Sequence, residues 1–187
     1  MKSSMKNQLR IIGGVHKRRQ LAFANIEGLR PTPDRLRETI FNWLMWDIEG
    51  AKVLDLCAGS GALSFEALSR GAKSVHMIEP SLEQVKFLKQ NLTLLNIENG
   101  KVYASTAQQA LAKINESFDV LFLDPPYALN LWEELSKLVD EKLNENALIY
   151  VEADRPLESL NLPKTWQQAK TSKVGIIYAG LYRKSEK

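Results

Sequence analysis

From residue 51 onward, the chain alternates short apolar runs with longer segments whose apolar residues recur at helical spacing. The short runs predict five strands, at residues 52–56, 74–79, 101–105, 118–124 and 147–152. The longer segments predict the intervening helices, at residues 61–70, 80–99, 107–114 and 131–143. Because strands joined through helices run parallel, this rhythm predicts an α/β fold with a mostly parallel, doubly wound sheet that helices cover on both faces.

The C-terminal part of the chain departs from this alternation. Residues 166–171 and 174–182 have the composition of two strands around Ser172 and Lys173. Strands that follow each other so closely pair antiparallel. We therefore expect a C-terminal hairpin that closes the sheet.

The first 50 residues are expected to form a separate N-terminal extension, followed by a second unit at residues 51–187. Residues 9–12 and 20–23 flank two glycines and predict a small hairpin. Thr32, Pro33 and Asp34 then supply a cap, a first-turn proline and an early acid, which predict a helix that runs to about Ile48.

Charge is distributed unevenly between these two units. Residues 1–37 contain nine Lys or Arg and two acids, a net charge of +7, whereas the remaining residues carry 16 basic and 20 acidic side chains. This polarity favours contact between the N-terminal arm and a polyanion, although a solvated basic tail gives the same pattern. Arg30, Arg35 and Arg37 could instead pair with acids of the fold. The candidates for phosphate contacts are Arg10, Lys17, Arg18, Arg19, Arg30, Arg35 and Arg37.

Several kinds of protein are disfavoured by composition. The apolar runs are far shorter than the roughly 20 residues of a membrane span, and the N-terminal residues lack an apolar signal core, so we expect a cytoplasmic protein. One cysteine and two histidines provide neither an internal disulfide nor a recognisable zinc site. We therefore expect no structural metal.

A glycine-rich turn follows the first strand of the predicted sheet. In such folds this turn lets backbone amides approach a ligand closely. The nicotinamide fingerprint fits badly, because Ser64 replaces its third glycine and Asp55 ends the strand. A carboxylate at that point favours an ammonium group, such as the amino-acid end of S-adenosylmethionine, over a pyrophosphate. The candidate cofactor-binding residues in and before the turn are Asp55, Cys57, Ala58, Gly59, Ser60 and Gly61.

Acidic and polar residues also follow the second and third strands. Glu79 could accept the two hydroxyls of a ribose, with Pro80 beside it, although a solvated acid at a helix start explains Glu79 as well. Thr106 and Ala107 lie where a polar turn could reach an adenine edge.

The fourth strand ends in Asp124-Pro125-Pro126-Tyr127. Two prolines stiffen the turn and remove two backbone donors, which leaves outward carbonyls as acceptors. The Asp124 carboxylate adds an acceptor, and the Tyr127 ring can stack on a flat heterocycle. The four residues therefore predict a pocket for an exocyclic amine of a base. Because ligands of open α/β sheets bind at the carboxyl ends of the strands, this pocket and the cofactor turn should converge.

With these motifs, the chain resembles the class I S-adenosylmethionine-dependent methyltransferases with a Rossmann-like fold that modify exocyclic amines. Arg10-Ile11-Ile12-Gly13-Gly14, the segment from Arg30 to Glu38 and Gly180-Leu181-Tyr182-Arg183 look more narrowly like the bacterial 16S rRNA guanine-N2 methyltransferase family. Thr106 departs from the Asp or Asn that this family often has after strand three.

The resemblance implies that residues 51–187 are a methyltransferase domain and residues 1–50 an RNA-contacting extension. It implies S-adenosylmethionine as cofactor, 16S rRNA or a small-subunit assembly particle as partner, and methylation of guanine N2. Asp124 and the Pro125 carbonyl would hold the amine, which directs its lone pair at the methyl donor. A monomer is expected. Two alternatives remain: an adenine-N6 or cytosine-N4 DNA or RNA methyltransferase, and a non-catalytic RNA-binding module.

Overall fold

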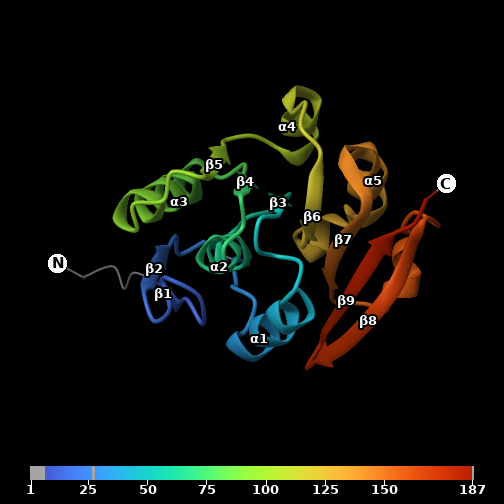
Figure 1. Cartoon of the computed structure of the whole chain (residues 1–187), viewed down its shortest axis with the longest axis horizontal. Coiled ribbons are helices and arrows are strands. Elements are labelled where there is room, and N and C mark those ends of the chain that lie inside the picture. The colour runs from blue at the N-terminus through green and yellow to red at the C-terminus, as the bar shows by residue number, and fades with distance from the viewer. Residues whose placement is uncertain (1–6, 27, 187) are drawn as a thin grey trace.

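The computed structural model describes residues 7–26 and 28–186 and contains a seven-stranded sheet of order β5-β4-β3-β6-β7-β9-β8 (Figure 1). Lys2, Lys6 and Glu27, which enter the charge of the arm, lie outside the described residues. Along this order, the neighbouring strands from β5 to β7 pair in parallel, and β9 is antiparallel to both β7 and β8. The strands are β3 (Lys52–Asp55), β4 (Ser74–Ile78), β5 (Gly100–Tyr103), β6 (Phe118–Leu123), β7 (Leu143–Ala153), β8 (Trp166–Val174) and β9 (Ile177–Lys184). The predicted fold class and its closing hairpin are confirmed.

Helices cover both faces of this sheet. The α-helices are α1 (Asp34–Trp43), α2 (Ala62–Ser69), α3 (Leu82–Leu94), α4 (Ala107–Lys113) and α5 (Trp132–Val139). Three short 3-10 helices lie in the described connections between β6 and β8: η1 (Tyr127–Leu129), η2 (Asp140–Lys142) and η3 (Leu157–Leu160). The first three α-helices and the last two lie on opposite sides of the sheet (Figure 1).

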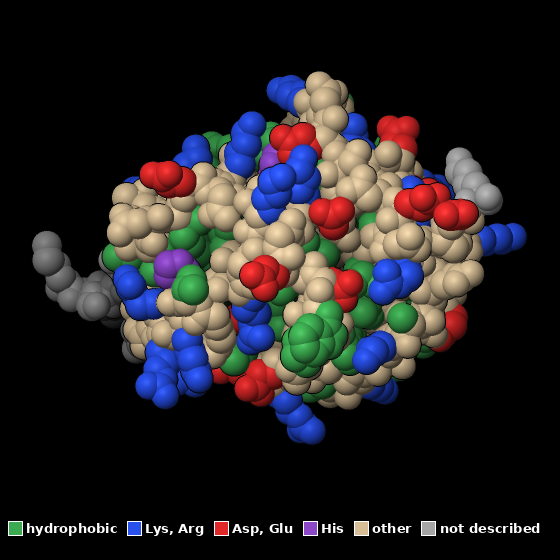
Figure 2. All heavy atoms as spheres, in the orientation of Figure 1, with side chains coloured by type: hydrophobic (Ala, Val, Ile, Leu, Met, Phe, Trp, Pro, Cys, Tyr) green, Lys and Arg blue, Asp and Glu red, His purple; other side chains and the backbone are tan. Residues whose placement is uncertain are grey.

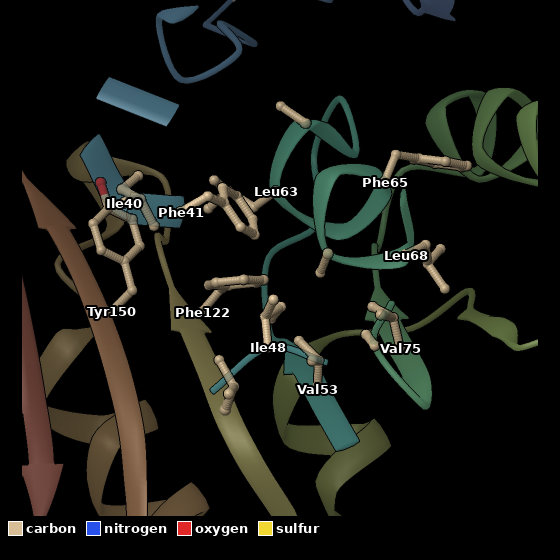
Figure 3. Packing of buried hydrophobic residues seen from close by; sticks show 14 of the residues in the cluster. Ile40, Phe41, Ile48, Val53, Leu63, Phe65, Leu68, Val75, Phe122 and Tyr150 are labelled. Carbon is tan, nitrogen blue, oxygen red and sulfur yellow. The ribbon is translucent and has the colours of Figure 1, made fainter. Parts of the chain in front are cut away.

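The alternation of side chains along the strands explains the two layers, because successive residues of a strand point to opposite faces. On β6, Val120 and Phe122 join the cluster beneath α1 and α2, whereas Leu121 and Leu123 join the cluster beneath α4 and α5. Figure 3 shows the first cluster, where Phe122 lies near Phe41 of α1. A strand buried on both faces needs apolar residues at successive positions, as residues 120–123 of β6 have.

The N-terminal extension shares this core. Strands β1 (Asn7–Arg10) and β2 (Gln20–Phe23) form the predicted antiparallel hairpin, and the buried side chains Leu9 and Leu21 belong to the same cluster as α1 and α2. The buried carboxylate of Glu66 on α2 accepts the backbone N–H groups of Ile12 and Gly13. The basic hairpin is therefore held against α2 by backbone hydrogen bonds as well as by apolar packing.

The ends of some elements differ from the sequence predictions. The C-terminal hairpin turns at Gly175 and Ile176, because Ser172 and Lys173 still pair with β9 and Gly175 adopts a left-handed φ of 59°. Helix α1 ends at Trp43 and continues as turns to Ile48.

Two further predictions at element boundaries were wrong. Thr32 does not cap α1, since its hydroxyl donates to Glu152 and Pro33 occupies the cap position. Leu143 begins β7 instead of ending the preceding helix.

Candidate active site

A cavity of about 540 Å³ lies where β3, β4, β6 and β7 end, so residues far apart in the sequence share one wall. This is the edge at which open parallel sheets bind their ligands. Two segments outside the parallel strands complete the lining: residues 28–33, before α1, and the tip of the β8–β9 hairpin. The acidic lining residues are Asp55, Glu79, Asp124 and Glu152.

Asp55 at the end of β3 is buried and holds one unused acceptor. Its Oδ2 accepts a 2.7 Å hydrogen bond from the hydroxyl of Ser64 on α2, whereas its Oδ1 has no hydrogen-bond partner in the described part of the chain. Burial raises the pKa of Asp55 from its usual 3.8 to about 7, against the opposing effect of the Ser64 hydrogen bond. An unpaired carboxylate oxygen at a cavity wall is stabilised by a cationic hydrogen-bond donor.

The glycine-rich turn brings the backbone close to this carboxylate. Gly59 and Gly61 have backbone φ angles of 54° and 83°, which residues other than glycine rarely adopt. A Cβ atom on Gly61 would lie 2.7 Å from Leu88 and 2.8 Å from Phe65. Gly61 therefore lets the turn pass tightly into α2, although it is absent from the cavity lining.

Glu79 at the end of β4 connects the glycine-rich turn to the next helix. Its two carboxylate oxygens accept the backbone N–H groups of Gly59, at 3.0 Å, and Ser81, at 2.8 Å. Burial raises the pKa of Glu79, and these two hydrogen bonds oppose the rise. A carboxylate oxygen has two lone-pair sites, so each oxygen can accept one further donor from the cavity.

The Asp124–Tyr127 motif forms the opposite wall. The phenol of Tyr127 donates to Glu152 at 3.0 Å, and its ring stacks at 6.1 Å on the buried ring of Trp132. Arg155 donates to the Tyr127 carbonyl at 3.1 Å and lies over the same Trp132 ring. The motif is thus braced from behind by α5 and by the segment after β7, while Pro126 stays exposed.

Glu152 is a site residue that our sequence predictions missed. It is 4% exposed, ends the parallel run of β7 and accepts hydroxyl hydrogen bonds from Thr32, Tyr127 and Tyr150. Glu152 also lies close enough to Asp124 to affect the pKa of that carboxyl. One signal was available, because Glu152 ended a predicted parallel strand as Asp55 and Glu79 did.

The four acids give the cavity a strongly acidic character. Burial raises the pKa of Asp124 well above its usual range, and the Glu152 carboxylate raises it further. Burial likewise raises the pKa of the Cys57 thiol, with Asp55 as the next contributor. The thiol is therefore held in its un-ionised form, which argues against a nucleophilic role. Crowded buried carboxylates favour cationic or amine ligands.

The structure brings most of the predicted site residues together. The cavity lining contains Asp55, Cys57, Ala58, Gly59, Ser60, Glu79, Asp124, Pro125, Pro126 and Tyr127. Gly61, Pro80, Thr106 and Ala107 do not line it. Thr106 instead caps α4 through a reciprocal capping box with Gln109. Leu29, Thr32, Ile176 and Ile177 were not predicted, because nothing in their local sequence marks them as neighbours of the site.

The predicted basic residues divide into two groups. The guanidinium of Arg37 is 1% exposed, pairs with Asp34 and Glu66 and donates to the carbonyls of Arg10 and Thr32. Its predicted phosphate contact was therefore wrong, since a buried side chain cannot reach a backbone phosphate. The others are exposed: Arg10, Lys17, Arg18, Arg19, Arg30 and Arg35. Figure 2 shows basic side chains gathered at the lower left, where Figure 1 draws the β1–β2 hairpin.

The part of the chain at residues 7–26 and 28–186 contains no group of three or more His, Cys, Asp or Glu residues arranged to hold a metal ion. None of its helices combines the length and apolar character needed to cross a membrane.

The family described as Conserved hypothetical protein 95 matches residues 9–183, which is nearly the whole chain. The chain belongs to this family. Among its relatives, the Ribosomal RNA small subunit methyltransferase D of Haemophilus influenzae is 42% identical over 184 residues, with 95% of each chain covered. The protein of the same name in Escherichia coli K12 is 39% identical, with 97% of this chain and 92% of the relative covered.

Solved structures share the fold of this family member. The Escherichia coli protein yhhF is 38% identical and has a TM-score of 0.86, with 97% of this chain and all of that chain covered. The structure of SMU.776 complexed with SAH is 12% identical and has a TM-score of 0.77. That comparison covers 98% of this chain and 57% of that chain, and at such low identity it shows the fold alone.

Proposed function

We propose that this protein transfers a methyl group from S-adenosylmethionine to the exocyclic N2 amine of a guanine in 16S rRNA of the small ribosomal subunit. The observation that carries the proposal is the single cavity in which Asp55 and Glu79 face Asp124 and Tyr127. The carboxylates of Asp55 and Glu79 suit a cationic nucleoside, and the wall that carries Asp124 and Tyr127 suits a planar amine. The names of the relatives support ribosomal RNA as the substrate.

The residues present fit S-adenosylmethionine. The unpaired Oδ1 of Asp55 can accept the ammonium group of its amino-acid end, and Glu79 can accept ribose hydroxyls while it keeps its two backbone hydrogen bonds. A fold neighbour that is complexed with SAH supports the same cofactor class. When bound, S-adenosylmethionine supplies an electrophilic methyl group on a positively charged sulfur.

Asp124 and the Pro125 carbonyl would accept the two N–H groups of the target amine. A guanine amine is a poor nucleophile, because its lone pair is delocalised into the ring. Two fixed acceptors orient the nitrogen, which reduces the entropic cost of in-line transfer. Stacking on Tyr127 is worth about 1–3 kcal/mol and would offset part of the cost of extruding the base.

We assign rRNA contact to the extension at residues 1–50 and methyl transfer to residues 51–187. Six exposed basic side chains on and near the hairpin, all but Arg37 of the predicted set, suit a phosphate backbone. Arg30 also lines the cavity, so it lies where the arm and the target pocket meet.

The decisive experiment is transfer of a tritiated methyl group to 30S subunits, naked 16S rRNA and duplex DNA, followed by nucleoside analysis. We expect N2-methylguanosine from one of the two rRNA substrates and no label in DNA. Recovery of N6-methyladenine or N4-methylcytosine would overturn the choice of base. Calorimetry that detects no binding of S-adenosylmethionine would overturn the enzymatic proposal as a whole.

A further inference from the structure

A second hollow, of about 350 Å³, lies beside the active-site cavity. Pro31, Thr32 and Pro33 line both spaces, so this short segment forms a ridge between them. The β1–β2 hairpin lines the hollow on the other side of the ridge. A chain-like ligand with one unit in the cavity can therefore place a neighbouring unit in the hollow.

The face of the hairpin that lines the hollow is polar. Arg10 and Gln20 lie directly opposite each other on the two strands, and Gln8 lies two residues before Arg10. Because side chains alternate along a strand, these three share the exposed face, whereas Leu9 and Leu21 point into the core. Their side chains form no hydrogen bond or ion pair with any residue of the ranges 7–26 and 28–186. The polar groups of all three can therefore bind a ligand.

Buried contacts hold the ridge and the hairpin in a fixed arrangement. The guanidinium of Arg37 donates through Nε to the carbonyl of Thr32, at 3.2 Å, and through Nη1 to the carbonyl of Arg10, at 2.8 Å. On the cavity side, the Thr32 hydroxyl donates to Glu152 at 3.1 Å. Prolines before and after Thr32 restrict the backbone further. The hollow is thus formed before a ligand binds, which reduces the entropic cost of binding.

The charges on the two sides of the ridge suit a phosphate backbone. Arg30 lines the cavity but not the hollow, and Arg10 lines the hollow but not the cavity, so each side has a cationic side chain. Asp34 also lines the hollow, but its carboxylate pairs with the buried Arg37. A polyanion that crosses the ridge therefore meets a compensated carboxylate and an arginine on each side.

Two glutamines beside an arginine suit a nucleotide. A carboxamide presents a donor and an acceptor side by side, which matches the neighbouring donors and acceptors on the edge of a base. A guanidinium binds a phosphate through several N–H groups. Single-stranded RNA presents its base edges to proteins, whereas an A-form duplex keeps them in a deep, narrow groove. The chemistry of the hollow therefore favours a nucleotide of a single-stranded segment.

We propose that the hollow binds the nucleotide next to the target guanine, with Gln8 and Gln20 on its base and Arg10 on its phosphate. The proposal rests on the proposed function, because it requires a target base in the cavity. It gives the hairpin a second role: the exposed face of its strands recognises the base beside the target, whereas the basic loop between the strands contacts phosphates. The choice of one guanine then depends partly on the hollow.

The test is the selectivity of methyl transfer for the bases beside the target. The modified guanine is first located by nucleoside analysis of 16S rRNA fragments. Transcripts of 16S rRNA with each base at the two neighbouring positions then serve as substrates, naked and assembled into 30S subunits. We expect kcat/KM of the wild-type protein to differ by about 10-fold between bases at one of these positions. The double variant Gln8→Met and Gln20→Met keeps side-chain size and removes both amides, so the difference should fall to about twofold or less.

Two further variants separate base recognition from other effects. The matched control is Gln90→Met with Gln167→Met, because both side chains are exposed and line neither the cavity nor the hollow. It should keep the wild-type selectivity. Arg10→Gln should decrease the slope of log affinity for rRNA against log salt by about 1, and an unchanged slope would overturn the phosphate contact. A wild-type protein that is indifferent to both neighbouring bases would overturn the proposal, as would undiminished selectivity of Gln8→Met with Gln20→Met.

Nuclear magnetic resonance of the side-chain amides tests the hollow without methyl transfer. The signals of Gln8 and Gln20 are identified by their absence from the two single methionine variants. Saturation with a short single-stranded RNA that contains guanine should shift both signals and leave the Gln167 signal in place. RNA that binds without shifting the Gln8 and Gln20 signals would overturn the proposal. Absence of methyl transfer by the wild-type protein would instead overturn the proposed function, and the amide signals would still show whether the hollow binds RNA.

Discussion

The two walls of the cavity are built in different ways. On the wall of β3 and β4, hydrogen bonds from the backbone and from one buried serine hold Asp55 and Glu79 within a short stretch of sequence. On the wall of β6 and β7, Tyr127 is held by a hydrogen bond to Glu152, and Glu152 is held in turn by Thr32 from the N-terminal extension. The first wall is a local motif, whereas the second is assembled from three distant segments.

This difference predicts that mutations can affect binding of the methyl donor and binding of the target amine separately. The first wall should govern affinity for the methyl donor, and the second should govern turnover and target binding. The substitutions of Asp124 and Asp55 are each directed at one wall, and the later ones test the folding of the glycine-rich turn and the role of the basic hairpin.

The largest effect is expected from Asp124→Ala on the second wall. Loss of the acceptor for the target amine should reduce the methyl-transfer rate by about 10²–10³-fold. Affinity for S-adenosylmethionine, measured by calorimetry, should stay within about twofold, since we propose that the donor contacts Asp55 and Glu79 and not Asp124. Asp124→Asn should lose less activity than Asp124→Ala, because the amide oxygen can still accept a hydrogen bond from the target amine. Parallel loss of donor affinity and turnover would place Asp124 in the donor subsite.

The next effect is expected from Asp55→Asn on the first wall. Removing a charge-assisted hydrogen bond to an ammonium group costs about 1.5–3 kcal/mol, which lowers donor affinity by roughly 10- to 100-fold. In the wild-type protein the affinity should itself fall as the pH drops below about 7, where Asp55 takes up a proton. This pH dependence should disappear in Asp55→Asn. An exposed acid far from the cavity, changed in Glu145→Gln, is the matched control.

The same substitution should have the opposite effect on stability. The pKa of Asp55 is raised from 3.8 to about 7 by folding, so the stability that its protonated form contributes is complete below about pH 3.8 and lost as the pH rises to about 7. Asparagine never ionises. Urea unfolding of the free proteins should therefore show that the stability of Asp55→Asn relative to wild type increases as the pH rises from about 4 to about 7. If the difference in free energy of unfolding between the two proteins does not vary with pH, the Asp55 carboxyl is not desolvated.

A smaller effect, on folding only, is expected from Gly61→Ala. The new Cβ would require a φ of 83° and would meet Leu88 and Phe65 below 3 Å, so we expect a loss of about 1–3 kcal/mol in the free energy of unfolding. Gly50→Ala separates the two causes, because Gly50 has a φ of 76° with open space around it. Equal losses in the two variants would attribute the effect to backbone strain alone.

The smallest effect is expected from simultaneous replacement of Lys17, Arg18 and Arg19 by alanine. If each side chain neutralises one phosphate, the slope of log affinity for rRNA against log salt should decrease by about 2–3. Donor affinity should not change. A triple replacement of Lys113, Lys164 and Lys170, which are exposed elsewhere, controls for net charge. An unchanged slope for the hairpin variant would show that these residues do not contact phosphates.

Much of the fold could be predicted because its signals are local. Helical spacing, glycines and strand-sized apolar runs identified the elements, with errors at their ends such as the hairpin turn at Gly175 and Ile176. Asp55, Glu79 and Asp124 could be predicted as neighbours because parallel strands bring their carboxyl ends to one edge. Thr106 also follows a parallel strand but lies outside the cavity lining. The carboxyl end of a strand indicates where its loop begins, but it does not determine which residue of that loop reaches the cavity.

The sequence by itself determined the order of strands and helices, the glycine-rich turn after the first strand and the acids at strand ends, since each follows from local composition and side-chain periodicity. Only the tertiary structure decided that Arg37 is buried between Asp34 and Glu66, that Ser64 holds Asp55 and that Glu152 joins Thr32, Tyr127 and Asp124. Most of these contacts join residues that are more than 20 positions apart in the sequence. Burial converts them from weak surface contacts into interactions that set charge. The desolvation of these charged side chains depends on all the segments that surround them, so the sequence of no single segment reveals it.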